Sequence, residues 1–235
     1  MIRTALIVAG GKGLRMGSEL PKQFLLVAAK PVLMHTLEAF HRYDEAMQLI
    51  VVLPREQQSY WKQLCSDYHF TLNHLIADGG ETRFHSVQNG LMLVQEPGLV
   101  AVHDGVRPLV AERIITENIE KCRKYGYAIT GMICKEAIMQ KVDDCVKNID
   151  IPRERLVRTQ TPHTYPLGTL LKAHAEADAK GIDGTVASCT LMAELGVDNQ
   201  HLVMGSEKNG LKLTQTEDVE LFKALKHTTK DEWLK

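Results

Sequence analysis

The chain begins MIRTALIVAGGKGLRMG, residues 1–17. Residues 5–9 are apolar and of strand length, and they run directly into a loop that contains Gly10, Gly11 and Gly13. In open α/β sheets, ligands bind in the loops that follow the carboxyl ends of strands. Glycines in such a loop let a phosphate group approach the backbone closely. The stretch therefore predicts an α/β fold with a phosphate-binding loop after its first strand.

Apolar segments of strand length alternate with longer amphipathic segments along the rest of the chain. The later predicted strands cover residues 49–53, 75–77, 99–103, 128–134 and 202–204. The predicted helices cover residues 32–43, 57–68, 86–95, 112–125, 167–180, 186–195 and 216–225. All-apolar strands such as 50–53 are typical of a parallel sheet covered on both faces. We expect one doubly wound, mostly parallel α/β domain over residues 1–235.

Residues 135–162 interrupt this alternation with a polar stretch. The sequence VDDCV at 142–146 indicates a turn between two short extended segments. We expect a β-arm here that protrudes from the domain. Because no Pro/Ser-rich linker, repeat or low-complexity segment divides the chain, we expect no second domain.

The composition excludes several classes of protein. With 44% apolar and 24% charged residues among 235, the chain has an ordinary globular composition. Its 28 Lys and Arg residues against 29 Asp and Glu leave no basic field for nucleic acid or anionic lipid. The five cysteines lie far apart, which indicates reduced thiols rather than a zinc cluster or a disulfide frame. Without an apolar stretch of signal-peptide or membrane-spanning length, we expect a cytoplasmic protein with no membrane partner.

The glycine loop does not match the two commonest phosphate-binding motifs. The dinucleotide fingerprint needs glycine where Met16 stands, and the P-loop needs Ser or Thr after a Gly-Lys pair, where Gly13 stands. What remains is a glycine loop with cations at Lys12, Arg15 and Lys22, which suits a nucleoside triphosphate. The alternative is a tight turn with solvated cations, but its position after the first strand favours a binding loop.

Two further segments carry candidate site residues. Paired glycines at Gly79 and Gly80 precede Ser86, which either caps the following helix or contacts a ligand. Asp104 follows an apolar strand, and Arg107 stands three positions later. One Asp beside a triphosphate is sufficient to hold Mg²⁺, because phosphates and water supply its other ligands. The alternative for Asp104 and Arg107 is an ion pair that only shapes the loop.

The sequence offers no Ser-His or Cys-His pair that would suggest a nucleophile. Glycines, cations and one metal-binding carboxylate instead suit an enzyme that positions its reactants and neutralises charge. Phosphoryl or nucleotidyl transfer is a reaction of this kind.

The motifs together resemble the 2-C-methyl-D-erythritol 4-phosphate cytidylyltransferase family and its relative, ribitol-5-phosphate cytidylyltransferase. The resemblance rests on AGGKGLRMG at 9–17, PKQFL at 21–25, GG at 79–80, SV at 86–87, HDGVRP at 103–108 and TP at 161–162. It is close through about Pro108 and looser beyond. It implies a Rossmann-like nucleotidyltransferase fold in which a polyol phosphate attacks the α-phosphorus of CTP and pyrophosphate leaves.

The resemblance also implies roles for individual residues. Arg15 and Lys22 would be catalytic, stabilising the charge that builds on the α-phosphate and the leaving group. Ala9, Gly10, Gly11 and Gly13 would cradle the triphosphate, and Gly79, Gly80 and Ser86 would face the cytidine. Asp104 would support Mg²⁺ and the acceptor substrate, and Arg107 would help to hold the substrate phosphate or its surroundings.

In the family, the arm exchanges across a homodimer. Arg153 falls at the position of an arm arginine, and Lys212 at the position of a substrate-binding lysine. By resemblance, Arg153 would therefore serve the site of the neighbouring subunit, and the dimer would be needed for activity.

Three departures from the family pattern lie on the acceptor side. Ala137 stands where the family has a Thr that contacts the polyol. A substrate hydroxyl would therefore lose a hydrogen bond worth about 0.5–1.5 kcal/mol. The family's Thr-Asp pair before the helix near Ala187 is missing, the nearest acid being Asp183. The usual Asn-Ile-Lys reads Gly-Leu-Lys at 210–212. The sequence thus indicates the reaction more firmly than the acceptor.

Four alternatives remain open at this point. The acceptor could be ribitol 5-phosphate or another sugar or polyol phosphate of a cell-envelope pathway. The same loop could serve another nucleotide, since glycine loops bind phosphates and not bases. The altered acceptor residues are also compatible with a catalytically idle nucleotide-binding protein. An NAD-type oxidoreductase is the weakest alternative, because Met16 interrupts the fingerprint.

Overall fold

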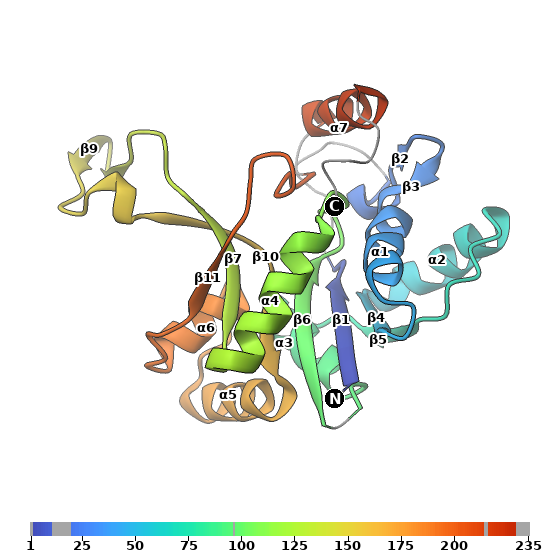
Figure 1. The fold of residues 1–235 in the computed structure, drawn as a ribbon, viewed down its shortest axis with the longest axis horizontal. Helices are drawn as coiled ribbons and strands as arrows, with labels where there is room; N and C mark the ends of the chain where they lie inside the picture. The colour runs from blue at the N-terminus through green and yellow to red at the C-terminus, as the bar shows by residue number, and fades with distance from the viewer. Residues whose placement is uncertain (1, 11–19, 96, 214–215, 229–235) are drawn as a thin grey trace.

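The structure is a computed structural model that describes residues 2–10, 20–95, 97–213 and 216–228. Its centre is a seven-stranded sheet in the order β11-β7-β10-β6-β1-β4-β5. The strands are β1 (Ile2–Val8), β4 (Gln48–Leu53), β5 (Leu75–Asp78), β6 (Gly98–Asp104), β7 (Ala128–Ile133), β10 (Val157–Pro166) and β11 (His201–Met204). β10 pairs antiparallel with both of its neighbours, and every other pairing in the sheet is parallel. The prediction of a doubly wound, mostly parallel α/β fold is confirmed (Figure 1).

Helices cover both faces of the sheet. One face packs against α1 (Val32–Tyr43), α2 (Arg55–Asp67) and α4 (Glu112–Tyr125). The other packs against α3 (Arg83–Leu91), α5 (Leu167–Lys180) and α6 (Ser188–Glu194). Side chains of β1 alternate between the two cores, with Ile7 in the first and Leu6 in the second. This two-sided burial explains why β4, the second half of β1 and the middle of β6 are largely apolar.

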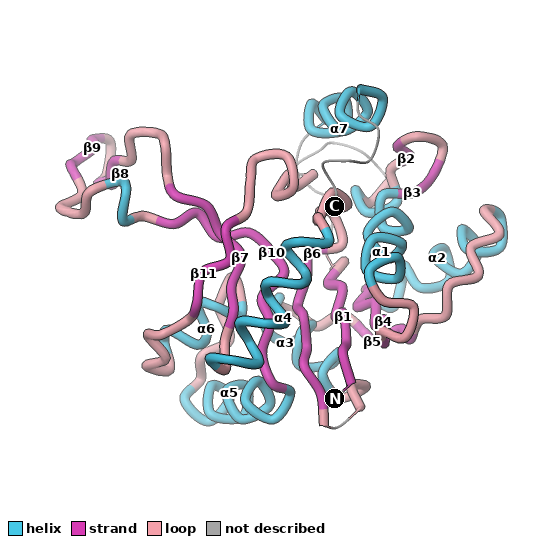
Figure 2. Tube along the Cα trace, viewed as in Figure 1, coloured by secondary structure: helices cyan, strands magenta, loops and turns pink. Residues whose placement is uncertain are grey.

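Three smaller features lie outside the two layers. A short hairpin of β2 (Leu26–Val27) and β3 (Lys30–Pro31) follows the 3-10 helix Lys22–Phe24. The helix α7 (Thr216–Thr228) packs over this hairpin through Phe222, which shares a small core with Val27 and Val32. Figure 2 shows α7 and the hairpin at the same end of the molecule. Among the described residues, no helix is long and apolar enough to cross a membrane.

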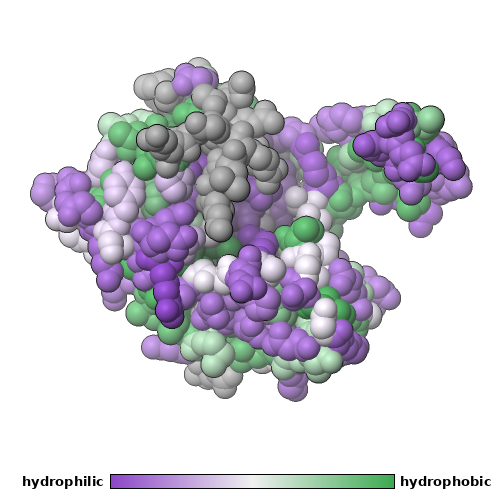
Figure 3. Space-filling model, turned by 180° about the vertical axis from the view of Figure 1, so that it is seen from behind, coloured by the Kyte–Doolittle hydropathy of each residue, from purple (hydrophilic) through white to green (hydrophobic). Residues whose placement is uncertain are grey.

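The segment at 135–162 divides into an arm and a core strand. The arm holds the hairpin of β8 (Met139–Val142) and β9 (Cys145–Asn148), with Asp143 at a positive φ of 51° in its turn. Residues from Val157 onward return into the sheet as β10, so the arm is shorter than the predicted range. The space-filling view shows the arm standing clear of the body, with apolar and polar groups side by side (Figure 3).

Candidate active site

The strand order places a ligand site between β1 and β6. From β1 the chain moves outward to β4 and β5, and then crosses back through α3 to β6 on the other side of β1. Such a reversal opens a crevice at the carboxyl ends of the two strands. Val8 and Asp104, the last residues of these strands, are register partners, and Gly105 N donates to Val8 O at 2.9 Å.

A cavity of about 310 Å³ opens at this crevice. It is lined by backbone and side chains from five parts of the chain: Val8, Ala9, Gly10, Lys22, Gln23, Gly80, Glu81, Thr82, Arg83, Ser86, Asp104, Val106 and Lys212. Seven of the predicted site residues are among them, namely Ala9, Gly10, Lys22, Gly80, Ser86, Asp104 and Lys212. The structure therefore brings the end of β1 with Gly10, the cations Lys22 and Lys212, and the carboxylate of Asp104 together.

Asp104 lies at the centre of a cluster of three cations. Its Oδ1 accepts from Arg83 Nη1 at 2.8 Å. Its Oδ2 accepts from Lys212 Nζ at 2.9 Å and from Arg107 Nε at 3.1 Å. Burial alone would raise the pKa of this carboxyl, but the three cations together hold the pKa well below its ordinary value of 3.8. Asp104 is therefore ionised at neutral pH.

Hydrogen bonds from β10 and from His103 fix the backbone around Asp104. Thr161 Oγ1, on β10, accepts from the Asp104 backbone N–H at 3.2 Å and lies 3.0 Å from His103 Nδ1. The other ring nitrogen of His103, Nε2, lies 3.0 Å from Arg107 O and donates to it. Burial lowers the pKa of His103 to about 4, so the ring is neutral and serves as one donor and one acceptor.

This arrangement makes Asp104 a poor ligand for Mg²⁺. Both carboxylate oxygens already accept from cations, and three positive side chains around one carboxylate repel a further cation. Among the residues that the structure describes, no group of three or more His, Cys, Asp or Glu side chains is placed to bind a metal. The expectation that Asp104 is a metal ligand does not fit this structure.

Arg107 is a structural contact to the loop that carries Lys212. Its side chain is nearly buried, its Nε binds Asp104 and its Nη1 donates to Gly210 O. Arg107 is not part of the cavity lining. Of its two expected roles, the structure favours holding the surroundings of the substrate over contacting the substrate phosphate itself.

The cytidine-side residues fold as a turn before α3. Gly79 N donates to Leu53 O at 2.7 Å, which fastens the turn to the neighbouring strand. Ser86 Oγ accepts from Gly80 N at 3.0 Å and donates to Thr82 O at 2.9 Å. The helix begins at Arg83 with Thr82 as its N-cap, so the reading of Ser86 as the cap is wrong. Ser86 instead fixes the loop from inside the first turns of the helix.

Two residues of the site were not assigned a role from the sequence. Arg83 follows the paired glycines, and only the sheet order places it beside Asp104. Gln23 is buried, and its Nε2 donates to Ala9 O at 2.9 Å and to Gln57 Oε1 at 2.6 Å. It thereby links the Lys22 segment to the end of β1. The sequence did contain a signal for Gln23, because it lies in the PKQFL segment on which the family resemblance rests.

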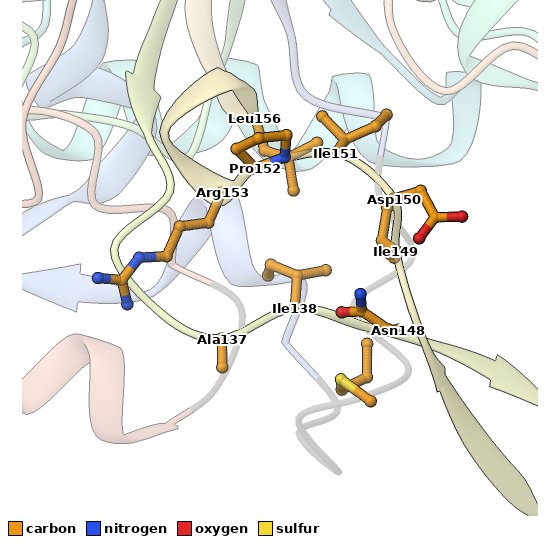
Figure 4. A pocket seen from close by; sticks show the side chains of 10 residues that line it. Ala137, Ile138, Asn148, Ile149, Asp150, Ile151, Pro152, Arg153 and Leu156 are labelled. Carbon is orange, nitrogen blue, oxygen red and sulfur yellow. The ribbon is translucent and has the colours of Figure 1, made fainter.

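Three predicted residues, Gly11, Gly13 and Arg15, lie outside the described residues. Arg153 lies in the 3-10 helix Arg153–Arg155 on the arm, with its Nη1 donating to Lys135 O at 3.2 Å. The structure does not bring it to the cavity of its own chain. It borders a separate hollow of about 530 Å³ on the arm, lined by apolar side chains such as Ile138, Ile151 and Leu156 (Figure 4).

Fold and site together define an α/β protein with a cation-lined cavity at a topological switch point of its sheet. Comparison with known proteins identifies the family to which it belongs. The sequence model described as 2-C-methyl-D-erythritol 4-phosphate cytidylyltransferase matches residues 3–227. The chain belongs to this family of cytidylyltransferases, which are nucleotidyltransferases.

Individual relatives agree with the family assignment. The 2-C-methyl-D-erythritol 4-phosphate cytidylyltransferase of Bacteroides thetaiotaomicron is 46% identical over 96% of this chain and 100% of the relative. The ribitol-5-phosphate cytidylyltransferase of Lacticaseibacillus paracasei is 36% identical over 94% of this chain and 96% of the relative. The crystal structure of 2-C-methyl-D-erythritol 4-phosphate cytidylyltransferase from Thermus thermophilus aligns with a TM-score of 0.77 at 28% identity, covering 97% of this chain and 100% of that one.

Proposed function

We propose that this chain transfers the cytidylyl group of CTP to 2-C-methyl-D-erythritol 4-phosphate. An oxygen of the acceptor phosphate attacks the α-phosphorus of CTP. The bond from that phosphorus to the oxygen that bridges to the β-phosphate breaks, and pyrophosphate leaves with the electron pair. The observation that carries the proposal is the cavity in which Gly10, Lys22 and the Asp104 cluster meet.

The cavity supports this reaction through charge and position. Gly10 places the backbone end of β1 at the cavity wall, where a polyphosphate can approach it. Lys22 supplies a cation for the charge that builds on the phosphates in the transition state. Arg83 and Lys212 carry their charges on the acceptor side, fixed by Asp104. With this arrangement, the chain itself needs no nucleophile.

The choice of 2-C-methyl-D-erythritol 4-phosphate over ribitol 5-phosphate rests on the relatives. The relatives named for the first acceptor reach 46% and 45% identity, against 36% for the ribitol enzyme. Thr185 and Ser188 line a small hollow that shares Arg83 with the main cavity. They provide hydroxyl groups near the place where the family's Thr-Asp pair is missing.

The proposal includes three features of the working enzyme. Mg²⁺ would be held by the phosphate oxygens of CTP and by water rather than by Asp104, because hard cations bind oxygen ligands in this way, and it would neutralise charge on the phosphates. The protein works as a homodimer in which Arg153 of the arm serves the partner's site. Its location is cytoplasmic, consistent with five free thiols.

The test of the reaction is pyrophosphate release with CTP, ATP, GTP or UTP, each with 2-C-methyl-D-erythritol 4-phosphate. CTP should give the highest rate, and Lys22→Ala should lower it by about 10²–10³-fold. Lys62→Ala, on the exposed face of α2, is the matched control and should keep full activity. CTP binding without pyrophosphate release would instead support the idle nucleotide-binding protein.

A further inference from the structure

The loop that carries Lys212 has no regular structure to hold it in place. It spans residues 205–213, between β11 and α7. Inside it, Gly210 N donates to Ser206 O at 2.9 Å and Ser206 Oγ donates to Asn209 Oδ1 at 2.7 Å. Such local bonds shape a turn but do not fix its position against the sheet. That position depends on contacts from elsewhere in the chain.

Gln160 of β10 provides a contact at the centre of this loop. Its side chain is only 4% exposed, and its Nε2 donates to Ser206 O at 2.9 Å. Gly205 and Gly210 pack on either side of its amide group. A Cβ built on Gly205 or on Gly210 would overlap that amide. The two glycines therefore leave the space that the Gln160 side chain fills.

The backbone of β10 is irregular where it carries Gln160. Its register with β7 shifts between Thr159 and His163. The next residue, Thr161, accepts the backbone N–H of Asp104 at 3.2 Å. Two consecutive residues of one strand thus hold the two partners of an ion pair. Thr161 holds Asp104, and Gln160 holds the loop that brings Lys212 Nζ to within 2.9 Å of Asp104 Oδ2.

We propose that Gln160 is a positioning residue that sets the affinity for the acceptor phosphate through Lys212. It does not line the cavity, so it acts on substrate only through the loop. Loss of its hydrogen bond loosens the middle of the 205–213 loop, which Gly205 N to Gly131 O, Leu213 N to Val106 O and Arg107 Nη1 to Gly210 O still attach to the sheet, and weakens the Lys212–Asp104 pair. CTP binding, at the Gly10 and Ser86 side of the cavity, is left unchanged. This inference rests on the proposed function for its kinetic part.

The test compares Gln160→Met with Gln200→Met. Methionine keeps the unbranched length of glutamine but removes the amide donor. Gln200 is the matched control, because its Nε2 also donates to a carbonyl, Cys189 O, at 2.8 Å, and it does not line the cavity. The first readout is the KM for the acceptor and the KM for CTP. The second is hydrogen exchange of the backbone amides in 206–213, which needs no substrate.

Gln160→Met should raise the acceptor KM about fivefold to tenfold and leave the CTP KM within about twofold. It should also speed amide exchange in 206–213, while Gln200→Met changes neither quantity. Equal changes in both KM values, or unchanged exchange in this loop, would overturn the proposal. If the unaltered protein turns over no acceptor, the proposed function fails, and the exchange result still decides whether Gln160 holds the loop.

Discussion

Asp104 carries one negative charge among three cations, and its role follows from that imbalance. Arg83, Arg107 and Lys212 would repel each other without it, and Arg107 is nearly buried. A carboxylate in this position holds Arg83 and Lys212 at the cavity wall, the side proposed for the acceptor. Each of these cations is thereby fixed before a phosphate arrives, which lowers the cost of organising the site.

Asp104→Asn should destabilise the protein, because it removes the charge that compensates three cations. We expect a loss of about 2–4 kcal/mol in the free energy of unfolding, measured by urea denaturation. The Mg²⁺ concentration for half-maximal activity should stay within about twofold, because the metal is held by phosphates. A large rise in the required Mg²⁺ concentration would show that Asp104 is a metal ligand after all.

Three buried histidines predict how stability depends on pH. Burial lowers the pKa of His103, His163 and His174 to about 4 each, against an ordinary value of 6.5. Below pH 6.5 these histidines become protonated in the unfolded chain but stay neutral in the folded chain. The stability contributed by these neutral rings is therefore complete above pH 6.5 and is lost as the pH falls toward 4.

Urea midpoints measured from pH 7.5 to 4 should show this loss. His174→Leu should reduce the slope, because its ring stacks on Phe84 and neither ring nitrogen has a hydrogen-bond partner among the described residues. A midpoint that stays constant over this range would contradict the account of neutral, buried rings.

At the level of elements, the helices could be predicted, whereas β10 of the central sheet and the short strands β2 and β3 could not. α1, α4 and α5 begin and end at the predicted residues. Proline precedes α1 and α5, and Gly126 and Gly181 end α4 and α5 in the left-handed conformation. These signals are local. By contrast, β10 is a buried strand with polar side chains, so its sequence reads as part of the arm.

The polar residues of β10 find partners far away in the sequence. Thr161 contacts His103 and Asp104, and Thr130 Oγ1 donates to Pro162 O at 2.8 Å. The sequence of the strand alone does not predict those partners. For the same reason the sequence did not predict a role for Arg83, because its partner Asp104 lies at the end of another strand. The cavity residues that follow β1 and β6 were predictable because strand ends mark ligand sites on their own.

The arm gives a prediction about the proposed dimer. Arg153→Ala and Lys22→Ala should each be nearly inactive alone, because each spoils both sites of a dimer. In a heterodimer of the two, one site has both an intact Lys22 and an intact Arg153 from its partner. A refolded equal mixture should therefore recover about a quarter of normal activity, measured as pyrophosphate release. Activity no higher than the mean of the separate variants would contradict a shared site.

At the scale of the whole molecule, the order of the strands brings Gly10, Lys22 and the Asp104 cluster to one cavity. In the proposed reaction these groups bind the triphosphate, stabilise the transition state and hold the acceptor. Family membership gives the reaction, and the residues at 137, 183–187 and 210–212 are where this chain departs from the pattern that its sequence resembles. These departures lie on the acceptor side, so the choice of acceptor is the property to measure.

The most direct test is to measure kcat/KM for 2-C-methyl-D-erythritol 4-phosphate and for ribitol 5-phosphate, with CTP and Mg²⁺, by pyrophosphate release. The account predicts a preference for the first acceptor of at least about tenfold, since buried polar groups discriminate between hydroxyl patterns. Lys22→Ala should abolish release with either acceptor. A preference for ribitol 5-phosphate, or release with neither, would contradict the proposed function.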